Sequence, residues 1–255
     1  MVENVELPDV LDGVVWLVGG EETTSRKSLD ENSYTPPRHV LVCGHGRGGT
    51  TAVSKVLLAL GLTTDEPNKF LESRPLKRLN KRGHFEDLVE AIRAWEGRPE
   101  RLFWKDPKIK SVHLVPFLPK LGDDVGFVFV FRDPLNIARR NDDFKGIGVM
   151  SGLDLAVRGY QRTINAIETV KDRKVILISY EKLIVVPQLV VGGLAKFLGI
   201  DDPEAIRRAI AVIEPNSAEY RQAVAESAAE PDEQNAKPKA TRKRRAAKAR
   251  KARNG

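Results

Sequence analysis

One stretch decides the fold of this chain: His39-Val-Leu-Val-Cys-Gly-His-Gly-Arg-Gly-Gly-Thr-Thr-Ala-Val-Ser-Lys-Val-Leu-Leu58. The short apolar run at residues 40–42 predicts a buried strand. The glycines that follow allow a sharp turn with no side chain inside it; they are Gly44, Gly46, Gly48 and Gly49. A helix then begins at Thr50 or Thr51, and its predicted apolar face consists of Val53, Val56, Leu57 and Leu60.

A strand, a glycine turn and a helix start together build a site for an anion. Unpaired backbone N–H groups point outward at a helix N-terminus, and the helix dipole favours negative charge there. Arg47 and the hydroxyls of Thr50 and Thr51 add further donors at the same place. The simpler alternative is an ordinary turn between a strand and a helix, so the rest of the chain has to decide between the two.

The glycine spacing also bears on which phosphate ligand would bind. The pattern Gly44-x-x-x-x-Gly49 matches the first part of a P-loop, but Thr50 stands where that motif has its lysine. Nucleotide triphosphatases use this lysine on the β- and γ-phosphates. Its absence therefore favours a different phosphate ligand.

The composition is typical of a soluble globular protein with one substantial domain. The chain has 255 residues, of which 41% are hydrophobic and 30% are charged. No segment approaches the length of a membrane span, and residues 1–6 lack the basic start of a signal peptide. The single cysteine, Cys43, excludes an internal disulfide and is predicted to be a small core residue. These features predict a cytoplasmic protein.

The positive net charge of +7 belongs to the C-terminal tail. Residues 235–255 contain ten Lys or Arg residues and no acidic residue. Without these ten charges the remainder of the chain has a net charge of −3. Since the tail is also low in apolar residues, it is predicted to be disordered.

Apolar runs alternate with helical patterns along the chain. Strands are predicted at 40–42, 101–104, 125–131 and 174–178, with a short additional strand at 14–18. Helices are predicted at 85–95, 112–121, 135–141, 153–170, 189–198 and 203–213, and residues 63–80 are predicted to be an irregular loop. Pro116 and Pro119 are expected to make the helix at 112–121 irregular. The helix at 153–170 is expected to bury its apolar positions 153, 156, 157, 160, 164 and 167.

This order of elements predicts an α/β fold with three layers, αβα, around a central parallel sheet. We expect a leader at 1–37, the α/β domain at 38–217, and an Ala/Glu-rich and then basic tail at 218–255. Ligands bind where the carboxyl ends of parallel strands share one edge of such a sheet. Four stretches follow strand ends at that edge: 44–51, 105–108, 132–140 and 180–183.

Several motifs at this edge resemble signatures of the sulfotransferases. Arg47-Gly-Gly-Thr-Thr51 resembles their 5′-phosphosulfate loop, and Arg132-Asp-Pro-Leu-Asn-Ile-Ala-Arg-Arg140 resembles their 3′-phosphate motif. Ser179-Tyr-Glu-Lys-Leu183, leading to Lys196-Phe-Leu-Gly199, resembles their Tyr-Glu-Asp-Leu and Phe-Leu-Gly region. Trp104-Lys-Asp-Pro107 is similar to a motif of tyrosylprotein sulfotransferases and bacterial relatives, and Asn80-Lys-Arg-Gly-His-Phe-Glu-Asp87 resembles a stretch of the bacterial group. The resemblance covers roughly residues 38–200 and implies the P-loop-like topology of that family.

The resemblance also implies a reaction. A sulfuryl group would move by in-line displacement from 3′-phosphoadenosine 5′-phosphosulfate (PAPS) to a hydroxyl or amine of a small-molecule, carbohydrate or lipid acceptor. Such a transfer depends mainly on positioning and fixed positive charge. In the implied site Arg47 and Lys105 bracket the transferring group, and the 5′-phosphate is held by Gly48, Gly49, Thr50 and Thr51.

The same resemblance implies ligands for the rest of the donor. Arg132 would bind the 3′-phosphate, and Tyr180 would pack near the adenine. Arg140 stands where members of the family usually have Ser, and we assign it to the 3′-phosphate as well, with Arg139 or Asn136 as the alternative if Arg140 points away.

A general base is needed to take the proton from the acceptor. Glu86 is the first candidate, His84 the second and His45 the third. The alternative for Glu86 is an exposed acid in the first turn of a helix, where the dipole stabilises it. No cluster of side chains has the spacing of metal ligands, so no metal requirement is expected.

Two other classes of function remain open. One is a P-loop kinase or another nucleotide-binding enzyme, with Asp133 as a magnesium ligand. The other is a non-catalytic binding protein whose basic tail contacts nucleic acid or an anionic membrane without sequence preference.

Overall fold

The computed structural model describes residues 14–18, 21–23, 34–107, 109, 111 and 113–213. Six strands form one sheet in the order β2-β1-β6-β5-β3-β4. Their bounds are β1 Val14–Val18, β2 Glu21–Thr23, β3 His39–Gly44, β4 Phe103–Lys105, β5 Val125–Phe131 and β6 Val175–Ser179. The basic tail predicted to be disordered lies outside the described residues.

The four strands β6, β5, β3 and β4 are parallel, which confirms the predicted parallel centre of the sheet. The edge differs from the prediction, because β1 pairs antiparallel with β6 and β2 pairs antiparallel with β1. The short strand predicted at 14–18 therefore exists, and it extends the sheet on the β6 side.

Side chains alternate between the two faces of the sheet, as the pleat of a strand requires. In β3, Val40 and Val42 belong to one buried apolar cluster, whereas Leu41 and Cys43 belong to another. Cys43 is buried, as expected for a small core residue. The sheet thus has two cores, one on each face, and the three-layer architecture follows from them.

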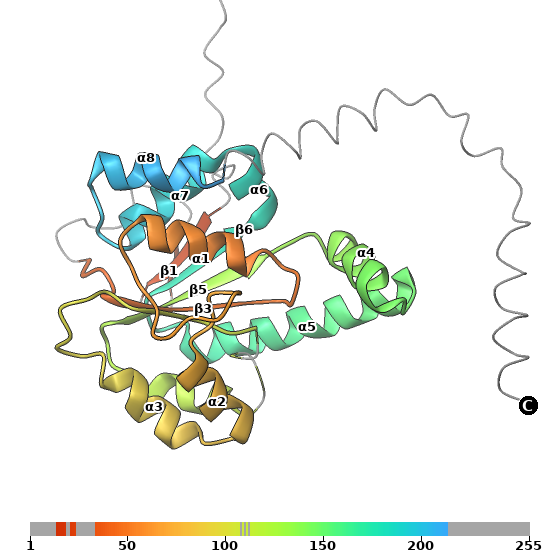
Figure 1. Cartoon of the computed structure of the whole chain (residues 1–255), viewed down its shortest axis with the longest axis horizontal. Helices are drawn as coiled ribbons and strands as arrows, with labels where there is room; N and C mark the ends of the chain where they lie inside the picture. Colours follow the sequence, from red (N-terminus) through yellow and green to blue (C-terminus); the bar gives the residue numbers. More distant parts are fainter. Residues whose placement is uncertain are drawn as a thin grey trace, which may run out of the picture. The chain divides into compact units, whose positions relative to one another are not determined.

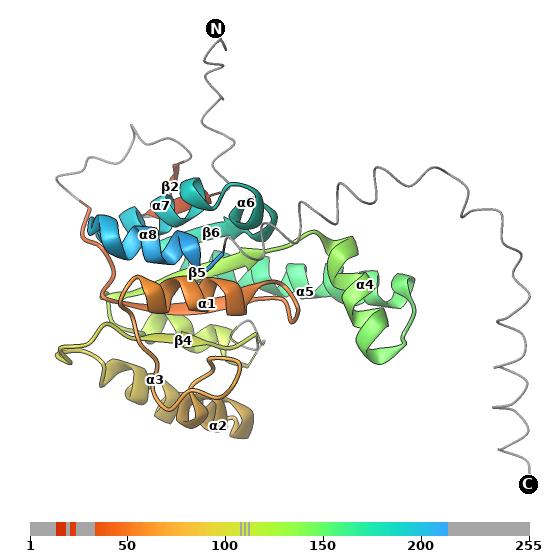
Figure 2. The same cartoon turned by 45° about the horizontal axis from the view of Figure 1, so that its top comes forward.

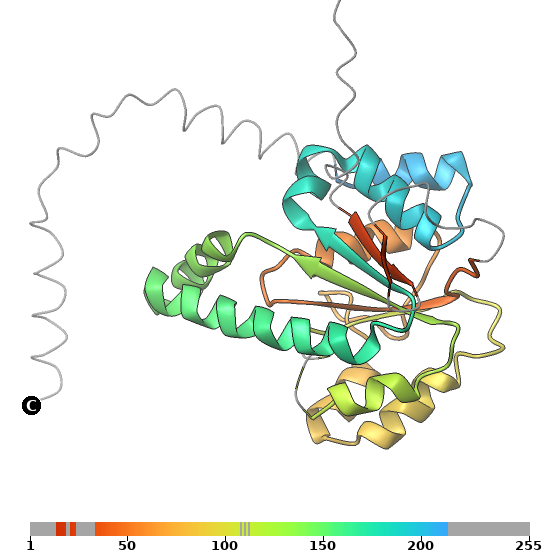
Figure 3. The same cartoon turned by 180° about the vertical axis from the view of Figure 1, so that it is seen from behind.

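Helices cover both faces of the sheet (Figure 1). One face is covered by α1 Thr50–Ala59, α6 Tyr180–Val185, α7 Pro187–Phe197 and α8 Pro203–Ala211. The other face is covered by α2 Arg74–Arg82, α3 Phe85–Arg93, a 3₁₀ helix Val115–Lys120 and α5 Val149–Val170. Figure 2 shows α2 and α3 beside the β4 edge, and Figure 3 shows α5 running past the strand ends to α4, Pro134–Lys145.

One segment differs from the prediction, and another shows the predicted irregularity. The predicted loop 63–80 contains the first part of α2, which begins because the Ser73 hydroxyl accepts a hydrogen bond from the Leu76 N–H and Pro75 occupies the first turn. The irregular helix predicted at 112–121 is observed as a short 3₁₀ helix, Val115–Lys120, since Pro116 and Pro119 lack the N–H groups that an α-helix needs.

The buried face of α5 also differs from the prediction. Val157 and Ile164 are exposed, and the buried positions are mostly small residues: Gly152, Ala156, Gly159, Thr163, Ala166, Ile167 and Val170. A Cβ on Gly152 would lie 2.8 Å from the carbonyl oxygen of Ala138, which is too close for any side chain. The small residues therefore let α4 and α5 pack with their backbones close together. Within the described part of the chain, no helix has both the length and the apolar character that crossing a membrane requires.

Candidate active site

A cavity of about 360 Å³ lies where the parallel strands end. Its walls come from the loop after β3, the start of α1, the end of β4, helix α4 and the start of α6. The structure brings together there most of the residues that the sequence pointed to, namely Arg47, Gly49, Thr50, Thr51, Lys105, Arg140 and Tyr180. Three of these side chains are cationic, so the cavity favours an anionic ligand.

The glycine loop has a strained backbone that only its sequence allows. Gly49 has a φ of 91° directly before α1, and a Cβ there would lie 2.0 Å from a ring carbon of Tyr180. Arg47 has a φ of 71°, which is unusual for a residue with a side chain. The Gly48 N–H donates to the His45 carbonyl oxygen at 2.8 Å and closes the turn. Such strain is maintained where the surrounding structure holds a functional conformation.

Arg132 follows β5 and reaches across to this loop. Its Nη1 donates a hydrogen bond of 3.0 Å to the carbonyl oxygen of Arg47. Its guanidinium carbon lies 4.6 Å from the centre of the Tyr180 ring, and its Nε lies 3.9 Å from Glu181 Oε1. Burial lowers the pKa of Arg132 below its usual range. The glycine loop, the end of β5 and the start of α6 therefore meet at one place, as the sequence predicted.

One donor of Arg132, its buried Nε, makes no hydrogen bond to any residue that the structure describes. The Glu181 carboxylate faces it at 3.9 Å, which is beyond hydrogen-bond distance. An unpaired buried donor costs free energy, about 1–3 kcal/mol, unless a ligand or water accepts from it. An oxyanion beside Arg132 would satisfy this group, so the residues present fit a phosphate ligand.

Lys105 ends β4 with its charge buried in the cavity wall. Its Nζ donates to the Phe70 carbonyl oxygen at 2.7 Å and to Thr51 Oγ1 at 3.1 Å, and lies 3.6 Å from Glu72 Oε1. Burial lowers the pKa of Lys105, although the Glu72 carboxylate opposes this effect. Lys105 thus sits between the start of α1 and the segment that precedes α2.

Glu72 is the site residue that sequence reasoning missed. It lines the cavity and is buried, and its Oε2 accepts hydrogen bonds from Asn68 Nδ2 at 3.0 Å and from Lys77 Nζ. Burial would raise the pKa of Glu72, but these hydrogen bonds and Lys105 together lower it, so the carboxyl group is ionised at neutral pH. The only available signal was its place in a long polar segment, which does not single out one residue.

The motif stretch Asn80-Lys-Arg-Gly-His-Phe-Glu-Asp87 has a structural role at its first residue. Asn80 in α2 is buried and donates from Nδ2 to Asp106 Oδ2 at 3.0 Å. Asp106 directly follows Lys105, and its own N–H donates to the Val42 carbonyl oxygen in β3. Asn80 therefore fixes α2 to the end of β4, next to Lys105.

The three residues predicted as candidates for the general base lie in different parts of the structure. Glu86 is exposed in the first turn of α3 and does not line the cavity. His84 caps the start of the same helix, with Nδ1 3.2 Å from Asp87 Oδ2. His45 lies in the glycine loop, where Nδ1 is 2.6 Å from the Gly46 carbonyl oxygen and Nε2 is 3.3 Å from the Leu155 carbonyl oxygen.

Comparisons with known proteins support the fold. No protein-family model matches the chain, and no curated protein matches its sequence. The structure is similar to the sulfotransferase domain of the olefin synthase from Synechococcus PCC 7002, with a TM-score of 0.51, 17% identity, and coverage of 76% of this chain and 86% of that one.

Two further solved structures are similar at a lower level. For the sulfotransferase domain from the curacin biosynthetic pathway the TM-score is 0.48 at 17% identity, with coverage of 69% of this chain and 78% of that one. For mouse sulfotransferase SULT7A1 complexed with PAP the TM-score is 0.46 at 18% identity, with coverage of 74% of this chain and 70% of that one. The Synechococcus similarity confirms the predicted α/β sulfotransferase topology, and it concerns the fold alone.

Proposed function

We propose that this protein is a sulfotransferase that moves a sulfuryl group from PAPS to an acceptor hydroxyl. The observation that carries the proposal is the meeting of two motifs at one cavity edge: Arg132 donates to the backbone of Arg47, beside Tyr180. A donor with phosphates on the 3′ and 5′ positions of its ribose would need two such neighbouring anion sites, which supports the proposal. The similarity in fold to a sulfotransferase domain supports the same conclusion.

Each end of the donor has its own ligands in this proposal. The 5′-phosphosulfate lies against the N-terminus of α1, where Gly49, Thr50 and Thr51 line the cavity. The first N–H groups of a helix have no partner within the helix and can bind an anion there. The 3′-phosphate accepts from Arg132, whose Nε has no other hydrogen-bond partner in the described chain, and from Arg140. The Tyr180 ring supplies an apolar surface for the adenine.

The transfer breaks one S–O bond and forms another. The sulfur leaves the phosphate oxygen of the donor and bonds to the acceptor oxygen, while adenosine 3′,5′-bisphosphate leaves with the released negative charge. Arg47 and Lys105 stabilise this charge because both cations line the cavity. The acceptor proton goes to a carboxylate.

We assign this proton to Glu72 in preference to Glu86. Glu72 is ionised and lines the cavity, with Oε1 facing Lys105. Glu86 is exposed on α3 and outside the cavity lining. Glu72→Gln should lower kcat by about 10²–10⁴-fold at unchanged affinity for the donor, whereas Glu86→Gln should leave kcat within about twofold. The opposite ranking of the two variants would return the role to Glu86.

The decisive test of the function compares two nucleotides. Adenosine 3′,5′-bisphosphate should raise the melting temperature without Mg²⁺, and radiolabelled PAPS should label a hydroxyl acceptor from a panel of small molecules, carbohydrates and lipids. A shift with Mg-ATP alone would instead support the kinase alternative. The kinase alternative uses Asp133 as a magnesium ligand. In the structure, Asp133 Oδ1 instead accepts a hydrogen bond of 2.8 Å from the Asn136 N–H and caps the N-terminus of α4.

A further inference from the structure

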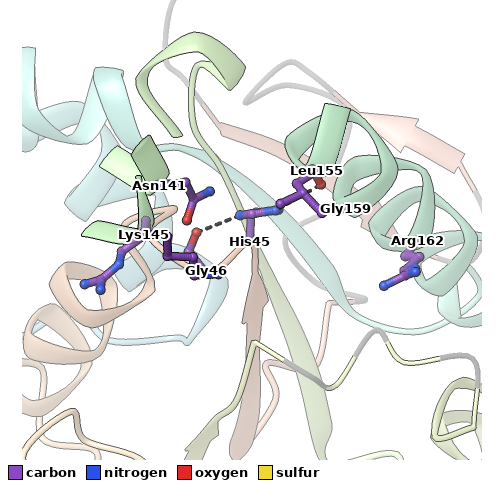
Figure 4. A pocket seen from close by; sticks show the side chains of 8 residues that line it. His45, Gly46, Asn141, Lys145, Leu155, Gly159 and Arg162 are labelled. Carbon is purple, nitrogen blue, oxygen red and sulfur yellow. Dashed lines mark hydrogen bonds between the residues drawn. The ribbon is translucent and has the colours of Figure 1, made fainter. Parts of the chain in front are cut away.

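A second cavity of about 310 Å³ lies on the other side of the glycine loop (Figure 4). It is enclosed by the loop residues 45–47, the C-terminal part of α4 and one face of α5. In Figure 4, His45 lies between Asn141 and Lys145 on one side and Arg162 on the other. We call it the α4–α5 pocket.

The charged side chains that line the α4–α5 pocket are cationic. They are Arg47, Lys145 and Arg162, and no Asp or Glu is among the described residues that line the pocket. Within the described part of the chain, none of the three forms a salt bridge. The neighbouring Arg158 is different, because it pairs with Asp154 one turn earlier on α5. Three cations without a salt bridge, around a cavity whose described lining contains no acid, favour an anionic occupant.

The uncharged side chains that line the α4–α5 pocket are also compatible with an anionic ligand. Asn141 is buried and supplies an amide donor. His45 is fixed in the pocket wall, with Nδ1 2.6 Å from the Gly46 carbonyl oxygen and Nε2 3.3 Å from the Leu155 carbonyl oxygen. The packing of His45 depends on Gly159, since a Cβ there would lie 2.2 Å from the imidazole Cδ2.

Arg47 connects the α4–α5 pocket with the cavity that the donor would fill. It lines both, and its left-handed backbone places it between them. Its guanidinium carbon also lies 4.2 Å from the centre of the exposed Phe144 ring, next to Lys145. A molecule held in the α4–α5 pocket could therefore extend past Arg47 to the reacting group.

We propose that the α4–α5 pocket binds the anionic group, a phosphate monoester or carboxylate, of the acceptor whose hydroxyl is sulfated. This proposal rests on the proposed function and specifies its acceptor class. Lys145 and Arg162 bind the anion, and Arg47 orients the part of the acceptor that carries the hydroxyl. The transfer itself is unchanged: the acceptor oxygen bonds to sulfur and its proton goes to Glu72.

The test measures binding of phenyl phosphate by calorimetry to the full chain saturated with adenosine 3′,5′-bisphosphate, with benzyl alcohol as the neutral comparison. We expect binding of phenyl phosphate and not of benzyl alcohol. Lys145→Gln and Arg162→Gln should each weaken it about tenfold, because a hydrogen bond to a charged group contributes at least that much. Arg158→Gln, on the same helix but paired outside the pocket, should leave it unchanged. Absent binding, or equal binding by all variants, would overturn the proposal.

The readout separates this proposal from the proposed function. If adenosine 3′,5′-bisphosphate does not bind, the donor assignment fails, and phenyl phosphate binding is measured without it to report on anion binding alone. If the bisphosphate binds and phenyl phosphate does not, only the acceptor class is wrong. Both variant positions are exposed, so the fold should be unaffected, and an unchanged melting temperature verifies this.

Discussion

Arg132 Nη1 donates a 3.0 Å hydrogen bond to the backbone carbonyl of Arg47. These residues are far apart in the sequence, one after β5 and the other in the turn between β3 and α1, and the parallel pairing of β3 with β5 brings them together. The contact uses one of the guanidinium donors, while the buried Nε donates no hydrogen bond to any described residue. The first prediction concerns this arrangement.

Arg132→Ala should weaken binding of adenosine 3′,5′-bisphosphate by about 10–150-fold, since charge-assisted hydrogen bonds contribute about 1.5–3 kcal/mol. Isothermal titration calorimetry measures the change. Arg139→Ala is the matched control, because Arg139 lies on α4 beside Arg140 and is exposed outside the cavity lining. Equal losses in both variants would mean that Arg132 contributes only through general charge.

Gly49→Ala should destabilise the protein and abolish donor binding. The φ of 91° costs a residue with a side chain about 1–2 kcal/mol, and the new Cβ would collide with the Tyr180 ring. Urea unfolding gives the stability change and calorimetry gives the binding. Gly46→Ala is the control, because no atom of the described residues lies within 4 Å of a Cβ there and Gly46 has no positive φ. Unchanged stability and unchanged donor binding in Gly49→Ala would contradict the role of the glycine loop in binding the donor.

Lys105→Met should lower kcat by about 10²–10³-fold while the protein stays folded. Methionine retains the apolar length of the side chain and removes the charge beside Glu72, together with the hydrogen bonds from Nζ to Thr51 and Phe70. Single-turnover kinetics separates this effect from donor affinity. Because burial lowers the pKa of Lys105 below 10.5, the wild-type rate should also fall with rising alkaline pH earlier than an ordinary lysine would predict. Unchanged turnover by Lys105→Met would remove Lys105 from the mechanism.

His39 should make the stability of the fold depend on pH. It is fully buried, its Nδ1 accepts from the Leu102 N–H at 3.0 Å, and burial lowers its pKa below 6.5. As the pH falls through 6.5, the unfolded chain takes up a proton that the folded chain refuses, so stability is lost below this pH and fully present above it. The free energy of unfolding should continue to fall until the pH reaches the lowered pKa of His39 in the folded state.

Urea unfolding at pH 5 and pH 7.5 measures the His39 effect. His39→Asn keeps an acceptor near the position of Nδ1 but does not titrate, so the difference in stability between the two pH values should shrink. The other titrating groups are common to both proteins and cancel in the comparison. An equal pH dependence in the variant would assign the effect to another group.

The strand, turn and helix around residues 39–59 follow from the sequence alone, because apolar periodicity and glycine placement are local properties. The same is true of the strand Val125–Phe131, which is observed with the predicted bounds. Parallel pairing was equally predictable, since alternating strands and helices bring successive strand ends to one edge. The local pattern and the pairing rule together were enough to predict that Arg47, Lys105 and Tyr180 lie at one cavity, as they do in the structure.

Other features depend on contacts between distant segments, and only the folded chain decides them. Glu72 became a site residue because Asn68 and Lys77 hold its carboxylate against Lys105, and no local pattern distinguishes it from any other glutamate. The buried face of α5 was predicted from apolar residues, but close packing against α4 selects small ones, so Gly152 is inside and Val157 outside. Local periodicity indicates which helix or strand a segment forms. Which of its charged or small residues becomes buried depends on the segment that packs against it.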